Sequence, residues 1–555
     1  MNHLKEKLFL FSIFVLALLL RTYGLNWDQN QHLHPDERFL TMVSTTIKLP
    51  SSISQYFDTT SSPLNPYNYK DYQFFVYGTF PLFLTKIIAE ILHLSDYNSI
   101  VLVGRFLSAL FDSFNIITLY FLSKLIFKKL LYLPSILYTF CVLPLQLSHF
   151  FAVDTYLTFF ILLTFTLLSY NLFVLAAIVF GLGLACKISA IYFVPIIGLF
   201  LIKKFKKIVY FLPIVFITFR IFQPYAFISL FKINPLFISN LKTLESFSSP
   251  SVWFPPAVQW LNRIPLLYSL QNIVIWGLGL PISLLLFFLL ITKFKSICNI
   301  KKNYFVVLSL AWILLLYFYQ GSQFSHNMRY FLPIYPFIFI ILTYLLSLIK
   351  LPKIVFIIFF LNFIWSLSFL SIYSKPHSRV QASQWIYQNI SSESSITNEY
   401  WDDPLPLSLI GHNPNQYRGA MLSLYDPDTP SKWQVINQQI NQADYLFLTS
   451  NRLWASIPRV PQKYPQTSIF YNNLFDENLN FSRLNRFVSY PGFNLSFLSA
   501  CYYLGPSNYP YKQKNNTWFE IDKNCNYKGI YFRDDLAEES FTVYDHPQVL
   551  IFKKK

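Results

Sequence analysis

The sequence predicts a multi-pass α-helical membrane protein whose carboxyl-terminal part forms a separate globular domain. Of its 555 residues, 54% are hydrophobic and only 13% are charged, a balance far from that of an ordinary soluble domain. Long apolar runs recur from residue 8 to residue 373 and then stop. The net charge is +17, and many of the lysines that contribute to it lie in the short gaps between those runs. The first two observations predict the fold class, and the third predicts the orientation.

Lysines in the gaps between apolar runs set the expected topology. Cytoplasmic loops of membrane proteins carry an excess of Lys and Arg, and only Glu6 offsets the basic residues in these gaps. The clusters are Lys5 and Lys7; Lys124, Lys128 and Lys129; Lys203, Lys204, Lys206 and Lys207; Lys293, Lys295, Lys301 and Lys302; Lys350 and Lys353. We therefore expect a cytoplasmic amino terminus, and we expect no nucleic-acid partner for the basic charge.

The first apolar run, residues 8–25, is expected to be a retained span, because no small-residue cleavage site follows it. A long outer loop, residues 26–98, comes next. Within it, residues 80–94 are apolar but interrupted by Lys86 and Glu90, which favours an interfacial helix on the outer leaflet. The other crossings are expected at residues 99–122, 130–147, three short runs within 156–202, 209–222, 266–292, 304–319, 330–349 and 354–373. The total is about eleven transmembrane helices, at roughly 20 residues per full span.

The last crossing is expected to end outside, which makes residues 1–373 a transmembrane domain and residues 374–555 an extracytoplasmic one. The second part is long enough for one globular domain, of α/β or α+β class. Residues 384–390 fit an amphipathic helix. Residues 443–448 and 549–552 fit short buried strands.

Cysteines are few in the carboxyl-terminal domain, which contains only Cys501 and Cys525. An oxidising compartment could pair these two as a disulfide, and two unpaired thiols are the alternative. Their spacing predicts no zinc site.

Acidic residues stand at the outer face, directly after two expected spans. The first group is His34-Pro35-Asp36-Glu37-Arg38-Phe39, and the second acid is Asp154. Carboxylates beside hydrocarbon are costly, so their presence favours a functional site. With His34, they could hold a divalent cation, Mg or Mn, through Asp36 and Asp154. Alternatively, one carboxylate is a general base that another positions. The structural alternatives are a solvated loop for the first group and a helix cap for Asp154.

Basic residues are also expected at this face, where the charge rule disfavours them. They are Arg105, Lys187, Arg220 and Arg329. A phosphate group is the partner that such residues suit, and arginine can bind it with two hydrogen bonds. The alternative is that they are snorkelling anchors. We expect Asp112 to pair with Arg105 seven residues earlier and to take no part in catalysis.

Four short motifs together resemble the GT-C glycosyltransferases, a group that includes protein O-mannosyltransferases and the bacterial aminoarabinose and lipopolysaccharide-core transferases. The resemblance covers residues 8–373, and some relatives also carry a trailing outer domain. The motifs are Pro35-Asp36-Glu37-Arg38-Phe39, Gly104-Arg105-Phe106-Leu107-Ser108-Ala109-Leu110, residues 148–159, and Met328-Arg329-Tyr330-Phe331-Leu332-Pro333.

The resemblance implies a membrane glycosyltransferase of the hexosyl or pentosyl kind. Its donor would be a polyprenyl-phosphate-linked sugar, and its acceptor a hydroxyl of a lipid, glycan or protein at the extracytoplasmic face of the cell membrane, with inversion. Asp36 matches the first acidic residue of the family, Glu37 the acid beside it and Asp154 the second acidic loop. Arg329 would face the donor phosphate. Relatives often carry a Lys-Pro-Pro or Glu-Pro-like segment where this chain has Gly78-Thr79-Phe80-Pro81. The phosphate contact that relatives make there therefore stays open, with Lys70 or Lys86 as substitutes.

Two other functions are weighed against this one. A lipid or polysaccharide transporter or flippase would favour paired repeats and charges near the bilayer midplane, whereas this chain has no visible repeat and its acids lie at one face. A non-catalytic receptor would bind its ligand through the outer domain, and the acidic pair in the first loop would then have no role.

Overall fold

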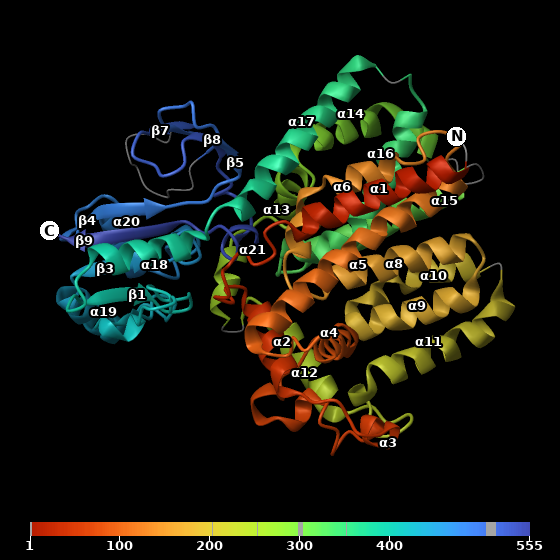
Figure 1. Ribbon diagram of the computed structural model, residues 1–555, viewed down its shortest axis with the longest axis horizontal. Helices are drawn as coiled ribbons and strands as arrows, with labels where there is room; N and C mark the ends of the chain where they lie inside the picture. The colour runs from red at the N-terminus through yellow and green to blue at the C-terminus, as the bar shows by residue number, and fades with distance from the viewer. Residues whose placement is uncertain (1–2, 203, 252–253, 298–302, 351, 507–517) are drawn as a thin grey trace. The chain divides into compact units, whose positions relative to one another are not determined.

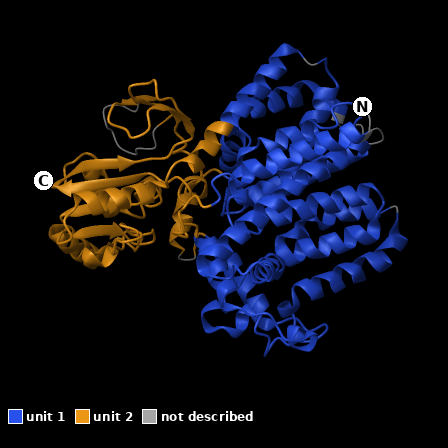
Figure 2. Ribbon diagram, viewed as in Figure 1, with its two compact units in different colours: residues 1–25, 35–249, 265–366 blue, residues 26–34, 250–264, 367–555 orange. Residues whose placement is uncertain are grey.

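The computed structural model describes residues 3–202, 204–251, 254–297, 303–350, 352–506 and 518–555. Three of the topology-setting lysines, Lys203, Lys301 and Lys302, lie outside the described residues. The chain forms two compact units (Figure 2). The first consists of Met1–Leu25, Pro35–Ser249 and Pro265–Ser366, and the second of Asn26–His34, Pro250–Ile264 and Leu367–Lys555. The start of the expected outer loop, residues 26–34, and the short segment 250–264 therefore belong to the second unit.

The first unit is built from helices that pack side by side (Figure 1). The longest, α5, lies against α1, α4, α6 and α8. The helices are α1 (His3–Thr22), α2 (Pro35–Thr46), α3 (Ile53–Phe57), α4 (Thr79–Ile91), α5 (Tyr97–Ile126), α6 (Leu133–Thr139), α7 (Val142–Ser148), α8 (Asp154–Ser169), α9 (Phe173–Cys186), α10 (Val194–Leu201), α11 (Ile208–Phe222), α12 (Pro235–Ser246), α13 (Leu267–Asn272), α14 (Leu280–Ile297), α15 (Tyr304–Ser322), α16 (Tyr335–Ser347) and α17 (Lys353–Leu370). Two short 3-10 segments, η3 (Ile188–Phe193) and η8 (Met328–Ile334), precede α10 and α16.

Every predicted span coincides with one helix or with a broken pair of helices, but the number of eleven crossings is not confirmed. Among the described residues, four helices are long and apolar enough to cross a membrane. They are Tyr97–Ile126, Tyr304–Ser322, Met328–Ser347 and Lys353–Asn389. Three further apolar helices are shorter: Asp154–Ser169, Phe173–Cys186 and Ile188–Leu201. The predicted interfacial segment is helical, as α4.

The predicted span at residues 130–147 is broken into α6 and α7, and Pro144 explains the break. Proline has no N–H, so the Phe140 carbonyl four residues earlier loses its helical donor. Two side chains of α17 donate to that carbonyl instead, Ser366 through its hydroxyl and Asn362 through Nδ2 at 3.3 Å. The break is stable in an apolar setting because its backbone oxygen is still hydrogen-bonded.

The expected pair between Asp112 and Arg105 is wrong. Asp112 is fully buried and pairs with Arg21 of α1, whose Nε lies 2.6 Å from Oδ2. The Tyr138 hydroxyl donates to the same carboxylate at 2.6 Å. Residues seven apart share a helix face but lie two turns, about 10 Å, apart along the axis, so a cation on the neighbouring helix is nearer.

Among its described residues, the second unit contains two sheets and the helices α18, α19 and α20 (Figure 1). The five-stranded sheet has the order β2-β1-β3-β9-β4, in which β1 is parallel to β2 and β3, and β9 is antiparallel to β3 and β4. The four-stranded sheet has the order β5-β8-β6-β7. The elements are α18 (Ser378–Asn389), β1 (Ile396–Glu399), β2 (Met421–Leu422), α19 (Pro430–Gln442), β3 (Tyr445–Leu448), α20 (Pro465–Phe475), β4 (Phe481–Phe487), β5 (Gly492–Asn494), β6 (Cys501–Leu504), β7 (Phe519–Asp522), β8 (Gly529–Phe532), α21 (Glu539–Thr542) and β9 (Val549–Lys554).

The helix and the two strands that the sequence predicts for this unit are confirmed. The expected helix at residues 384–390 is part of α18, and the two expected strands are β3 and β9. Of the two states left open for Cys501 and Cys525, the structure has the disulfide. Helices α19 and α20 cover one face of the five-stranded sheet, where Trp433 and Phe470 pack in a core with Leu446.

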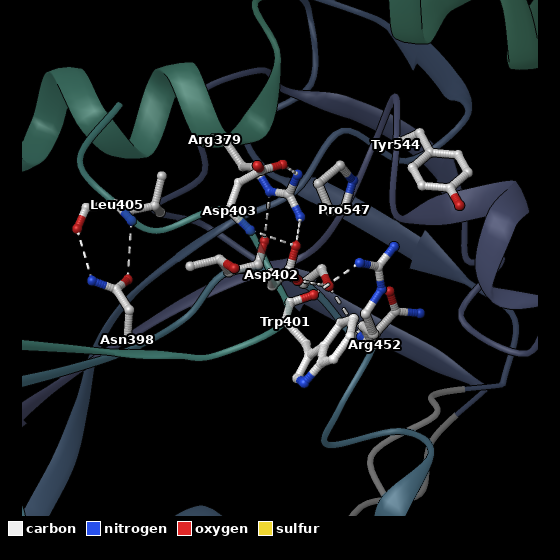
Figure 3. A network of polar contacts seen from close by, with 12 residues as sticks. Arg379, Asn398, Trp401, Asp402, Asp403, Leu405, Arg452, Tyr544 and Pro547 are labelled. Atoms are coloured by element: carbon white, nitrogen blue, oxygen red, sulfur yellow. Dashed lines mark hydrogen bonds and ion pairs between the residues drawn. The ribbon is translucent and has the colours of Figure 1, made fainter. Parts of the chain in front are cut away.

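A buried polar network fastens α18 to the loops that follow β1 and β3. Figure 3 shows the Arg379 guanidinium between two carboxylates, Asp402 and Asp403, with Asp403 Oδ2 at 2.9 Å. Arg452 donates to the Trp401 carbonyl at 2.9 Å and pairs with Glu539 at 2.6 Å. Because the side chain of Arg379 is only 1% exposed, we interpret the network as a structural tie.

Candidate active site

Asp36 and Glu37 lie in the first turn of α2, which begins at Pro35. Proline suits the first position of a helix, and carboxylates there interact favourably with the helix dipole. The Asp36 side chain is 28% exposed and forms an ion pair with Arg329 Nη1. Arg329 is placed by Asn327, which caps η8 and accepts the Arg329 backbone N–H at 3.2 Å. The first predicted acid is thus accessible and lies against the predicted phosphate-binding arginine.

Asp154 forms the second ion pair of the site, with Lys187. Asp154 is the first residue of α8, and Lys187 follows the last turn of α9 with an extended backbone. Lys187 Nζ lies 2.7 Å from Asp154 Oδ1, and the carboxylate is only 3% exposed while the lysine is 22% exposed. A ligand can therefore reach the lysine of this pair more easily than the carboxylate.

Tyr330 joins the two ion pairs into one cluster. Lys187 Nζ lies 4.7 Å from the centre of its ring, and Arg329 Cζ lies 5.6 Å from the same point. Both distances are within the range of a cation–π contact. The structure therefore brings Asp36, Arg329, Lys187 and Asp154 together, and we call these four residues with Tyr330 the charged cluster.

Gly78 holds the start of α4 against the end of α9, next to Lys187. Its N–H donates to the Cys186 carbonyl at 3.0 Å, and a Cβ on Gly78 would lie only 2.1 Å from the Ala185 oxygen. The close approach requires glycine. Tyr77, the residue before it, reaches the cluster: burial and the Asp36 carboxylate raise the pKa of Tyr77 well above its usual value of 10. Tyr77 is therefore held neutral beside Asp36.

Glu37 and Arg105 form a fully buried ion pair, and Glu37 directly follows Asp36 of the cluster in the sequence. Arg105 binds both carboxylate oxygens, through Nε at 2.9 Å and Nη2 at 2.5 Å, and both side chains are 0% exposed. The Phe151 N–H donates to Glu37 at 2.7 Å, and Arg105 donates to the Leu25 carbonyl at 2.9 Å. The pair thus connects α2, α5 and the segment before α8, and we interpret it as the support that sets the positions of Asp36 and Asp154.

Arg220 lies outside the charged cluster. Its guanidinium is 5.3 Å from the ring centres of both Phe57 and Phe227, and it donates to the Pro224 carbonyl at 3.3 Å. None of its described contacts is with the cluster. His34 belongs to the second unit, so we do not assign it to this site.

Tyr77 and Tyr330 are site residues that sequence reasoning did not select. Tyr330 stands within the motif that contains Arg329. The chain has 38 tyrosines, so the residue type alone does not single out Tyr330 as a site residue. The signal for Tyr77 was Gly78 directly before a helix start, a position where backbones approach closely.

The residues at the cluster do not fit a resident metal held by Asp36 and Asp154. Each of these carboxylates already pairs with a basic side chain. Within the described part of the chain, no group of three or more His, Cys, Asp or Glu side chains could hold a metal ion. We therefore derive no step through the Mg or Mn ion that the sequence left open.

Solved structures that match the chain include those of two proteins, one of them an oligosaccharyltransferase. The oligosaccharyltransferase of Archaeoglobus fulgidus in its apo form matches at 14% identity with a TM-score of 0.50, over 83% of this chain and 72% of that chain. The same enzyme, AglB, in complex with an inhibitory peptide and a dolichol-phosphate matches at 14% identity with a TM-score of 0.47, over 84% and 72%. ArnT from Cupriavidus metallidurans bound to undecaprenyl phosphate matches at 10% identity with a TM-score of 0.44, over 82% and 95%.

No protein-family model matches the sequence, and a search of curated proteins finds no significant relative. The likeness to the apo oligosaccharyltransferase shows that the chain has the fold of that enzyme. This shared fold agrees with the fold that the resemblance of the four sequence motifs led us to expect.

Proposed function

We propose that the chain is a membrane glycosyltransferase that moves a sugar from a polyprenyl-phosphate-linked donor to an acceptor hydroxyl, with inversion. The charged cluster is the observation that carries the proposal. It combines one accessible acid, Asp36, with two accessible cations, Arg329 and Lys187. An acid suits the proton of an attacking hydroxyl, and two cations suit a phosphate leaving group. The fold shared with an oligosaccharyltransferase agrees with this assignment.

Asp36 is the proposed general base, and Glu37 is not equivalent to it. In the reaction, the acceptor oxygen bonds to the anomeric carbon, the bond from that carbon to the phosphate oxygen breaks, and Asp36 takes the hydroxyl proton. A base must reach the proton that it accepts. Asp36 is 28% exposed, whereas Glu37 is 0% exposed and bound on both oxygens. We therefore give Glu37 a positioning role in the catalytic site.

Arg329 and Lys187 are the proposed phosphate-binding residues. Preorganised cations aimed at developing negative charge usually supply the largest part of catalysis. The Arg329 side chain is 22% exposed, so a phosphate oxygen can reach its guanidinium. A donor phosphate would compete with Asp36 for the guanidinium and leave the carboxylate freer to accept a proton. Arg105, by contrast, is enclosed with Glu37.

Replacing Arg329 by alanine should weaken binding of the polyprenyl-phosphate sugar by about 10- to 100-fold, since a charge-assisted hydrogen bond contributes about 1.5–3 kcal/mol. Arg329→Lys should recover part of the loss, because lysine keeps the charge and loses the fork of two donors. Arg220→Ala is the matched control and should bind the donor as the wild type does. A titration of purified protein with a fluorescent donor measures this. Equal donor affinity in wild type and Arg329→Ala would place the phosphate elsewhere.

Transfer itself is tested by mass spectrometry of lipid-linked sugars and cell-surface glycans in cells with the active gene and with an Asp36→Asn copy. We expect the donor lipid to accumulate and one glycan mass to disappear in the variant. This comparison also identifies the sugar and the acceptor. Identical lipid and glycan profiles would count against a transferase.

Labelling of single cysteines should place the carboxyl-terminal domain outside the cytoplasm, as the lysine pattern predicts. In a chain whose free native cysteines are replaced, Ser391→Cys should react with a membrane-impermeant maleimide on intact cells. Ser296→Cys, beside Lys295, should react only after the membrane is permeabilised. The reverse pattern would invert the topology and put the charged cluster on the cytoplasmic side.

A further inference from the structure

The second unit holds a pocket of about 660 Å³ that is separate from the charged cluster. It is walled by β4 of the five-stranded sheet, by strands β6, β7 and β8 of the other sheet, and by the start of α18. All its lining residues belong to the second unit. Its volume falls in the range of small-molecule sites, roughly 300–1,000 Å³. The pocket is therefore large enough for a ligand of two or three sugar rings.

Lys375 is the most unusual residue of this pocket. Lys375 is only 7% exposed, and Nζ lies 4.2 Å from the centre of the Tyr531 ring. Within the described part of the chain, its amine has no hydrogen-bond or ion-pair partner. Burial without a counter-charge lowers the pKa of Lys375 to about 7, and an anion from outside the chain would stabilise the protonated form.

Trp385 is an aromatic side chain of the pocket that a ligand can reach, because it is partly exposed. Three tyrosines of the pocket, Tyr490, Tyr503 and Tyr531, are each only 4% exposed. Cations already lie over two of these rings, Lys375 over Tyr531 and Arg486 over Tyr503. The C–H faces of sugar rings pack well on aromatic faces, because both surfaces are flat and apolar while the sugar hydroxyls stay at the edge.

The remaining walls suit those hydroxyls. Four side-chain amides line the pocket, and each can donate and accept a hydrogen bond: Gln381, Asn485, Asn524 and Asn526. The charged lining residues are Lys375, Arg483, Arg486 and Lys523 against Glu520 and Asp522. Glu520 is already held by Arg486 at 3.2 Å and by Arg533 at 2.5 Å. The basic groups therefore outnumber the acids that are left to balance them.

We propose that this pocket binds an acidic saccharide, with the anionic group of the ligand against Lys375 and a sugar ring against Trp385. The amides would hydrogen-bond the hydroxyls. The inference gives the second unit a binding activity of its own. It does not rest on the proposed glycosyl transfer, because no residue of the charged cluster takes part and binding can be measured without turnover.

The test is binding of the purified full-length protein in detergent to an array of uronic-acid, sialic-acid and phosphorylated glycans, each beside its neutral counterpart. We expect acidic glycans to bind and their neutral counterparts to bind at least about tenfold more weakly. Lys375→Met keeps the length of the side chain and removes the charge, and should weaken binding by about 10- to 100-fold. Lys553→Met is the matched control, since Lys553 is an exposed lysine near a tyrosine ring outside the pocket, and should change nothing.

A second measurement needs no variant. Reductive methylation of the wild-type protein, read by mass spectrometry, should be slowed at Lys375 by the bound glycan and unchanged at Lys553. The proposal is overturned by failure of every acidic glycan to bind, by equal binding to wild type and Lys375→Met, or by unprotected Lys375. Binding of inorganic phosphate or anionic lipid vesicles at Lys375 with no glycan binding would also overturn it, because the ligand would then be a simple anion or a lipid headgroup.

Discussion

Replacing Asp36 by asparagine should lower the rate of sugar transfer by about 10²- to 10⁴-fold, the usual contribution of a positioned general base. The amide has the shape of the carboxylate but cannot take the acceptor proton. The change also removes the negative partner of Arg329, which leaves that guanidinium available to the donor phosphate. We therefore expect donor affinity to stay constant or to rise while the rate falls. A lower rate with unchanged or higher donor affinity shows that the variant has lost the general base and has kept the donor-binding site.

Single-turnover transfer with purified protein and a polyprenyl-phosphate sugar measures both quantities. Asp71→Asn is the control, because Asp71 is an exposed acid of the same outer loop that belongs to a short 3-10 turn and is not a member of the charged cluster. It should transfer sugar at the wild-type rate. An Asp36→Asn enzyme that keeps its rate would reject Asp36 as the base, and Asp154 would be the next acid to test.

The sequence predicted the apolar helices, their order and the acids and cations that the structure brings together in the charged cluster, because these depend on local signals. Apolar runs, lysine clusters and the motif around Asp36 can each be read from a few neighbouring residues. The break at Phe140 follows from Pro144 in the same way, but only the structure shows that Ser366 and Asn362 replace the missing donor. Contacts across more than two hundred residues leave no local pattern.

The roles within the site could not be assigned from the sequence for the same reason. Asp36 and Glu37 are adjacent and chemically alike, yet one points to Arg329 and the other to Arg105. Neighbouring residues of a helix point about 100° apart, so their environments differ completely. Likewise, Arg220 and Arg329 both looked like phosphate ligands, and only the fold separates the one beside Tyr330 from the one between Phe57 and Phe227.

Replacing Arg105 by methionine should destabilise the first unit by about 3–5 kcal/mol, because it leaves the buried Glu37 carboxylate without its cation. Both side chains are 0% exposed, so water cannot solvate the unpaired carboxylate of Glu37. Lys124→Met is the matched control: it breaks an ion pair with Glu6 in which the side chains are 42% and 24% exposed, and should cost less than about 1 kcal/mol. Thermal unfolding of the purified protein in one detergent compares the two variants.

The double variant Arg105→Met with Glu37→Gln distinguishes an unpaired charge from lost packing. Glutamine is neutral and its oxygen can still accept the Phe151 N–H that Glu37 accepts at 2.7 Å. We therefore expect the double variant to be more stable than Arg105→Met alone, even though it carries one more substitution. It should still transfer sugar slowly, because the Arg105 guanidinium no longer holds the segments that carry Asp36 and Asp154 in position. If Arg105→Met unfolds at the same temperature as Lys124→Met or higher, the Glu37–Arg105 pair does not support the site. The positions of the two acids must then be set by Gly78 and the packing around it.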